Sequence, residues 1–142
     1  MSVKICSRCM AVFDGHKWFY DEGEHERFAR TGRAEATLCP GHERIEKRRI
    51  DGVVTLKGDF LKDHYDEAVN LINNVADKQL QRNVAARVYD MRQNGDGGIV
   101  IETTETSLAE RIGKEFEKAF NGDLVIQWLE DAEFVRVSWQ RN

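Results

Sequence analysis

Two short cysteine motifs constrain this chain more than any other feature of its sequence. The first is Cys6-Ser7-Arg8-Cys9 and the second is Cys39-Pro40-Gly41-His42. Each places two soft ligands three positions apart, the spacing of a tight knuckle around a tetrahedral zinc ion. Gly41 favours the sharp backbone turn that such a knuckle needs. Because the pairs use all three cysteines of the chain, they predict one structural Zn²⁺ ion, held by Cys6, Cys9, Cys39 and His42.

Other interpretations of these cysteines have less support. A redox dithiol at Cys6 and Cys9 needs a thioredoxin-like βαβ unit, which the start of the chain lacks. Three unrelated buried cysteines would rarely show two such spacings. A catalytic zinc ion keeps an open coordination position, and four protein ligands leave none. His42 completes the knuckle spacing, while His16 and His25, which lie between the motifs, stay open as alternative fourth ligands.

The composition is typical of a chain that folds in water. Apolar residues make up 41% and charged residues 32% of the 142 residues, and the formal net charge is −4. No segment approaches the roughly 18 consecutive apolar residues of a membrane helix, and the N-terminus lacks the apolar core of a signal peptide. Since the number of cysteines is odd, a closed disulfide framework is disfavoured, and we expect a cytoplasmic protein in a reducing compartment.

The hydrophobic pattern changes near residues 50–52 and divides the chain into two modules. We expect a zinc ribbon over residues 1–50 and a separate domain over residues 51–142. The almost wholly polar tract 21–33 predicts a loop. The ribbon would use three short strands, at residues 11–13, 17–20 and 36–38.

The second module alternates between strand and helix patterns. Apolar residues at helical spacing predict helices over 60–77 and 107–120, the latter with a capping box formed by Ser107 and Glu110. The order β-α-β-β-α-β-β predicts an α+β domain, a ferredoxin-like antiparallel sheet with two helices on one face and one extra strand. The strand-type runs are residues 53–57, 84–91, 99–104, 124–129 and 134–139.

Basic and aromatic residues near the second motif are candidate nucleic-acid contacts. In a strand, Trp18 and Tyr20 share one face, which either packs in a core or stacks on a nucleobase. The cations that follow the second motif alternate with Glu43 and Glu46, so they form either a solvated helix face or a patch that contacts phosphates. The candidates are Arg8, Lys17, Trp18, Tyr20, Arg44, Lys47, Arg48 and Arg49.

The charge is divided unevenly between the modules, which limits the possible partners. Residues 1–52 hold ten Lys/Arg and nine Asp/Glu, whereas residues 53–142 hold eleven and sixteen, a net charge of −5. Neither module has the strongly basic balance of a nucleic-acid-binding domain, so any polyanion contact would need a local patch. The sequence has no nucleophile elbow, Walker loop or H-E-x-x-H motif, and we therefore expect no enzymatic activity.

The chain resembles a family of small uncharacterised bacterial proteins that join a zinc ribbon to an α+β domain. The shared features are the first ligand pair, the second pair within Leu38–His42, then Gly58-Asp59-Phe60 and the T-T-x-x-x-L-A-x-R-I-G segment Thr103–Gly113. In the family the second knuckle often ends in Cys, where this chain has His42. More distantly, the order of modules is similar to that of the adaptor that escorts the large ribosomal subunit during its maturation and nuclear export.

Two functional hypotheses follow. The resemblance and the local basic cluster imply a non-enzymatic zinc-ribbon adaptor that binds RNA or a ribosomal particle. The alternative is a protein–protein interaction module with a structural zinc ion and no nucleic-acid contact, because residues 53–142, with a net charge of −5, would repel a polyanion.

Overall fold

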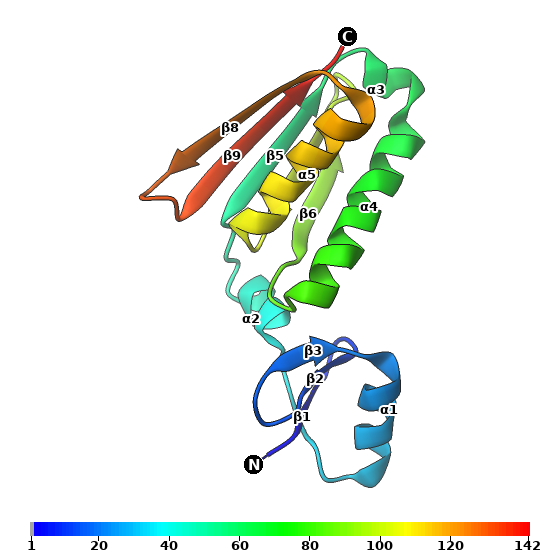
Figure 1. Ribbon diagram of the computed structural model, residues 1–142, viewed down its shortest axis with the longest axis vertical. Helices are drawn as coiled ribbons and strands as arrows, with labels where there is room; N and C mark the ends of the chain where they lie inside the picture. Colours follow the sequence, from blue (N-terminus) through cyan, green and yellow to red (C-terminus); the bar gives the residue numbers. More distant parts are fainter. Residues whose placement is uncertain (1) are drawn as a thin grey trace.

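The computed structural model describes residues 2–142 and has two parts, each with its own sheet (Figure 1). The two parts lie at opposite ends of an elongated molecule. Each combines helices with a mixed sheet, which confirms the α+β class. The N-terminal elements are β1 (Lys4–Cys6), β2 (Ala11–Phe13), β3 (Trp18–Tyr20), α1 (Glu22–Thr31), β4 (Glu35–Thr37) and α2 (Pro40–Glu46). The C-terminal elements are β5 (Gly52–Lys57), α3 (Phe60–Asp63), α4 (Tyr65–Arg82), β6 (Val88–Gln93), β7 (Ile99–Thr103), α5 (Thr106–Phe120), β8 (Asp123–Leu129) and β9 (Phe134–Gln140).

The N-terminal sheet has the strand order β3-β2-β1-β4. Its first three strands pair antiparallel, and β4 pairs with β1 in parallel. The predicted ribbon strands all form, displaced by at most one residue at either end. The buried cluster beside this sheet is small: it contains Cys6, Ala11, Cys39 and Val84, and Val12 of β2 is buried apart from it. A core of this size supplies little hydrophobic stabilisation. The stability of this part therefore depends on the interactions that hold its cysteines together.

The prediction of a loop over residues 21–33 is wrong, because α1 occupies most of that tract. The Asp21 carboxylate caps the helix by accepting a hydrogen bond from the Glu24 backbone N–H at 2.9 Å. Gly32 ends it in the left-handed region, with φ of 68°. None of the α1 residues is buried, so the helix has no fully buried apolar stripe that hydrophobic periodicity could detect.

The C-terminal sheet has the order β6-β7-β5-β9-β8 and is mixed, whereas the sequence predicted an antiparallel sheet. β9 lies between β5 and β8 and pairs with β5 in parallel, with Val54 opposite Val137. The burial of the two last strands agrees with this order. Along β9, Val135, Val137 and Trp139 are at most 1% exposed, whereas β8 contains no buried residue. β9 is thus an inner strand with one face in the core, and β8 is the edge.

Helices α4 and α5 cover one face of this sheet, as expected, and the main core lies between the two layers (Figure 1). Leu108, Ile112 and Phe116 form the predicted apolar stripe of α5 and are 0% exposed. Gly113 lets α5 approach the sheet closely, because a Cβ atom at this position would lie 2.4 Å from Cγ1 of Val137. The two helix stripes thus supply a core that is independent of the N-terminal part.

Three local boundaries differ from the predictions. The helix expected over 60–77 is divided into α3 and α4 at His64, and α4 continues to Arg82. The capping box is wrong, since α5 begins one residue earlier, at Thr106, and has no side-chain cap. The strand expected from Val84 begins only at Val88. The preceding residues form a turn in which the Asn83 carbonyl accepts a hydrogen bond from the Ala86 N–H at 3.0 Å.

Candidate metal centre

The four predicted ligands come together at the junction between the two parts. Cys6 ends β1, and Cys9 lies in the turn that leads to β2. Cys39 caps α2, and His42 lies in the first turn of that helix. The ligand atoms of Cys6, Cys9, Cys39 and His42 all lie within 4.8 Å of one another, which makes this group a possible metal site.

Three of the distances between ligand atoms lie between 3.4 and 3.8 Å. The sulfur atoms of Cys9 and Cys39 are 3.8 Å apart. Nδ1 of His42 lies 3.4 Å from the Cys39 sulfur and 3.7 Å from the Cys6 sulfur. Cys6 is 2% exposed and Cys39 is fully buried. The four ligand atoms therefore surround one small volume that is largely shielded from solvent.

Backbone geometry explains why the two motifs converge. Backbone N–H groups of Arg8 and Cys39 donate to the Cys6 sulfur at 3.4 and 3.3 Å, as expected for knuckles that support thiolates. Pro40 occupies the first turn of α2, where its missing N–H costs nothing. Gly41 is buried, and a Cβ atom there would lie 2.4 Å from the Val84 carbonyl oxygen. The glycine is thus required by close packing against the C-terminal part.

Arg87, from the C-terminal part, completes the surroundings of the site, and the sequence did not predict it. Its Nη2 donates to the sulfur atoms of Cys9 and Cys39 at 3.3 and 3.4 Å. Its Nε donates to the Val84 carbonyl at 2.9 Å, which fixes the plane of the guanidinium. No motif spacing connects Arg87 with residues so distant in sequence, so the sequence carried no signal for this contact.

Thr104 holds the backbone of Arg87 in place. The Arg87 N–H donates to the Thr104 hydroxyl at 2.8 Å, and the Thr104 N–H donates to the Arg87 carbonyl at 2.9 Å. The same hydroxyl donates to the Ala85 carbonyl at 2.6 Å. Thr104 is 0% exposed, so its polar groups are satisfied internally. The second threonine of the Thr103–Gly113 segment therefore positions an arginine at the candidate metal site.

The thiols of Cys9 and Cys39 share a hydrogen bond that separates their pKa values. This bond is the main cause that lowers the pKa of Cys9 to about 4, and the guanidinium of Arg87 acts in the same direction. The same hydrogen bond, together with burial, raises the pKa of Cys39. The pair thus favours one thiolate beside Arg87, and a bound cation would favour both.

The two alternative candidates for the fourth ligand, His16 and His25, lie outside the cluster of ligand atoms. Nε2 of His25 lies 2.9 Å from the Cys6 carbonyl oxygen, so this ring supports the first knuckle. His16 is exposed in the turn between β2 and β3. Of the three candidates for the fourth ligand, His42 is the one that the structure groups with the cysteines.

Most of the candidate phosphate-binding cations form ion pairs within the protein. Lys17 and Arg48 are the two exposed exceptions among the residues that the structure describes. Arg44 also donates to the Thr104 carbonyl at 2.9 Å and so connects α2 to the C-terminal part. The ion pairs are Arg8 with Glu46, Arg44 with Glu105 at 2.6 Å, Lys47 with Glu43 at 2.7 Å, and Arg49 with Asp51 at 3.3 Å.

The candidate aromatic residues pack against the metal centre. Trp18 and Tyr20 are half-buried and contact the small core that contains Cys6 and Cys39. The Trp18 ring also lies 5.7 Å from the ring of Phe13. Trp18 and Tyr20 therefore share one face as expected, and that face contributes to packing.

Comparison of the chain with protein-family models, with curated proteins and with solved structures finds no match. The resemblance to the bacterial family and to the ribosomal adaptor stays a prediction. Within residues 2–142, the helices are all too short or too polar to cross a membrane.

Proposed function

We propose that Cys6, Cys9, Cys39 and His42 hold one structural Zn²⁺ ion. Zinc bonds of about 2.3 Å to sulfur and about 2.0–2.1 Å to nitrogen give tetrahedral edges of about 3.8 Å between two sulfurs and about 3.6 Å between sulfur and nitrogen. The distances here are 3.8 Å between Cys9 and Cys39, and 3.4 and 3.7 Å from His42 to two sulfurs. The donor set and these three distances thus support zinc as the metal.

The centre is proposed to be structural and the protein non-enzymatic. Four protein ligands complete a tetrahedron and leave no position for a substrate or an activated water. Three thiolates and one Zn²⁺ ion leave a net charge of about −1, which Arg87 offsets from the neighbouring part. The metal would therefore stabilise both the two knuckles and the junction to which Arg87 belongs.

We also propose a more detailed architecture for the two parts. We propose that residues 1–50 are a zinc-ribbon module and that residues 51–142 are a ferredoxin-like domain whose added strand, β9, is inserted beside β5. The three cysteines are free thiols, and zinc binding needs them reduced. We accordingly propose that the protein works in the cytoplasm or in another reducing compartment.

We propose that the partner of this chain is another protein. The main support is the edge strand β8, where that protein would dock. Val125 and Trp128 on β8 are 63% and 44% exposed. β8 ends the sheet, so its outer backbone groups are free to pair with an added strand. The predicted RNA contacts have less support, because four of the six candidate cations already form ion pairs.

The test begins with protein purified without added metal, whose bound metals and nucleic acid are measured by elemental mass spectrometry and by absorbance. We expect about one zinc per chain and no salt-displaceable RNA. Proteins that co-purify with the wild type, after nuclease treatment, are then compared with those that co-purify with Val125→Lys. A partner lost in that variant supports docking at β8. RNA that is recovered and released by salt would instead support the adaptor hypothesis.

A further inference from the structure

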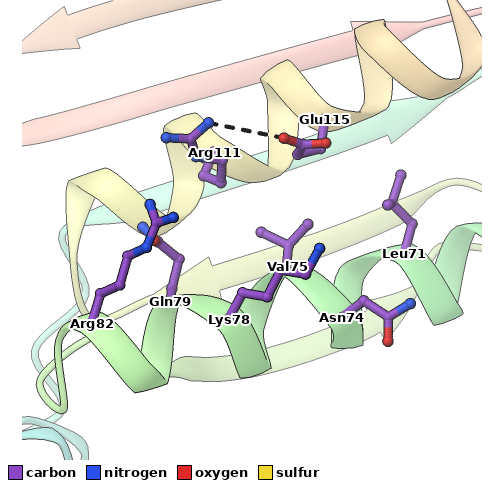
Figure 2. Close-up of a pocket in the computed structure, with 8 residues that line it drawn as sticks. All are labelled: Leu71, Asn74, Val75, Lys78, Gln79, Arg82, Arg111 and Glu115. Atoms are coloured by element: carbon purple, nitrogen blue, oxygen red, sulfur yellow. Dashed lines mark ion pairs between the residues drawn. The ribbon is translucent and has the colours of Figure 1, made fainter.

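A groove between α4 and α5 has a lining whose chemistry is unrelated to the metal centre (Figure 2). Its volume is about 270 Å³, just below the roughly 300 Å³ at which ligand pockets commonly begin. Six lining residues come from one face of α4 and two from α5; they are Leu71, Asn74, Val75, Lys78, Gln79, Arg82, Arg111 and Glu115.

The groove concentrates positive charge on an acidic domain. Lys78, Arg82 and Arg111 supply three cations against the single carboxylate of Glu115, whereas residues 53–142 as a whole have a net charge of −5. Arg111 and Glu115 are 3.9 Å apart, near the limit of an ion pair. This distance leaves the guanidinium of Arg111 free to bind another anion.

Among residues 2–142, neither Lys78 nor Arg82 forms an ion pair with an acidic residue. They lie one helical turn apart, and like charges at this spacing repel each other. The C-terminal dipole of α4 favours a cation at Arg82, but it does not explain why Arg111 faces the same groove from another helix. An anion bound between the three side chains would relieve their repulsion.

The two ends of the groove differ in polarity. Figure 2 shows Gln79, Arg82 and Arg111 at one end, with Leu71 and Asn74 at the other. The buried side chain of Val75 and the half-buried side chain of Leu71 provide an apolar surface beside the Asn74 amide. The first end suits a phosphate, because arginine binds its oxygens with two parallel N–H donors. Figure 2 draws the Lys78 amino group beside Val75, so the second end suits an organic group that carries hydrogen-bond acceptors.

We propose that the groove between α4 and α5 binds a small organic phosphate, with the phosphate held by Arg82 and Arg111 and by the flexible side chain of Lys78, one helical turn from Arg82 on α4. Its organic part would lie along Val75 and Leu71, where the Asn74 amide can donate or accept a hydrogen bond. A groove of about 270 Å³ matches a small molecule of nucleotide type better than a long polymer. This site is separate from the proposed zinc centre and from the β8 edge.

The test uses the full zinc-loaded protein, isotopically labelled, in titrations followed by amide NMR. The probes are adenosine monophosphate, adenosine and a hexauridylate RNA. We expect saturable, salt-sensitive binding of adenosine monophosphate, with shifts confined to residues 71–82 and 111–115, and much weaker binding of adenosine. A Lys78→Gln/Arg82→Gln variant should weaken binding by roughly tenfold or more, because charge-assisted hydrogen bonds are lost. Both side chains are exposed, so the variant should fold normally.

The matched control is Lys118→Gln, since Lys118 is an exposed α5 cation that does not line the groove. It should bind adenosine monophosphate like the wild type. The proposal is overturned if adenosine monophosphate does not saturate the protein, if the two groove substitutions leave its affinity unchanged, or if the shifts map elsewhere. Binding of hexauridylate without binding of adenosine monophosphate would also overturn it, because the groove would then recognise a polymer.

Discussion

At the scale of single residues, Arg87 connects the chemistry of the metal centre with the fold of the C-terminal part. One guanidinium donates to two cysteine sulfurs and to the Val84 carbonyl. Thr104 fixes the backbone on both sides of it. A lysine has the same charge but lacks the planar fork that reaches three acceptors at once.

We therefore expect Arg87→Lys to weaken zinc binding by about 10- to 100-fold, the usual effect of removing a partner that orients metal ligands. Competition with a chromophoric zinc chelator measures this change. Arg92→Lys is the matched control, because Arg92 on β6 is exposed and, among residues 2–142, forms ion pairs only with Asp90 and Glu102. Equal zinc affinity in Arg87→Lys and in the wild type would contradict a role for the guanidinium at the centre.

The sequence predicted the ligand cluster well because each knuckle is a local pattern. Cys6 with Cys9, and Cys39 with His42, are three positions apart, and tetrahedral coordination makes the two pairs complementary. Arg87 could not be found this way, since its position depends on how the turn at Asn83 packs against Gly41. The sequence did not predict the ion pair of Arg44 with Glu105 either, because it also depends on how the two parts pack against each other.

At the scale of elements, α5 is the segment that the sequence predicts best. Its apolar stripe was evident from periodicity alone, whereas α1 has no buried residue and forms through its caps. The sequence also did not predict that β9 lies beside β5. Both β8 and β9 could occupy that position, and their sequence patterns do not decide between them. Gly113 of α5 adds a constraint that periodicity does not show, since it faces the sheet without a side chain.

Gly113→Val should destabilise the C-terminal part by about 1–3 kcal/mol, the usual cost of overpacking a filled core. A Cβ atom at Gly113 would lie 2.4 Å from Val137 and 2.9 Å from Leu124. Urea unfolding followed by circular dichroism measures the loss. Gly95→Ala is the control, because a Cβ atom at Gly95 has no neighbour within 4 Å. A Gly113→Val protein as stable as the wild type would show that α5 can shift away from β9.

At the scale of the whole molecule, the two parts differ in what holds them together. The C-terminal core is formed by two helices and a five-stranded sheet that bury a large apolar cluster. The buried cluster around the cysteines contains Cys6, Ala11 and Cys39 of the N-terminal part and Val84 of the C-terminal part. The folding free energy of the N-terminal part should therefore come mainly from the metal, as in other small zinc-dependent modules.

Removing the metal should consequently unfold one part and spare the other. After chelation, or in Cys9→Ser, we expect amides of β1 and β2 to lose protection from hydrogen exchange, whereas those of β5, β7 and β9 keep it. Mass spectrometry of peptides measures both sets in one sample, and readdition of zinc should restore protection in the wild type but not in the variant. Cys9→Ser is the sharper case, because it also removes one acceptor of Arg87. Full zinc content and unchanged protection in this variant would refute the four-ligand centre, and loss of protection in both parts together would show that the junction joins them into one cooperative unit.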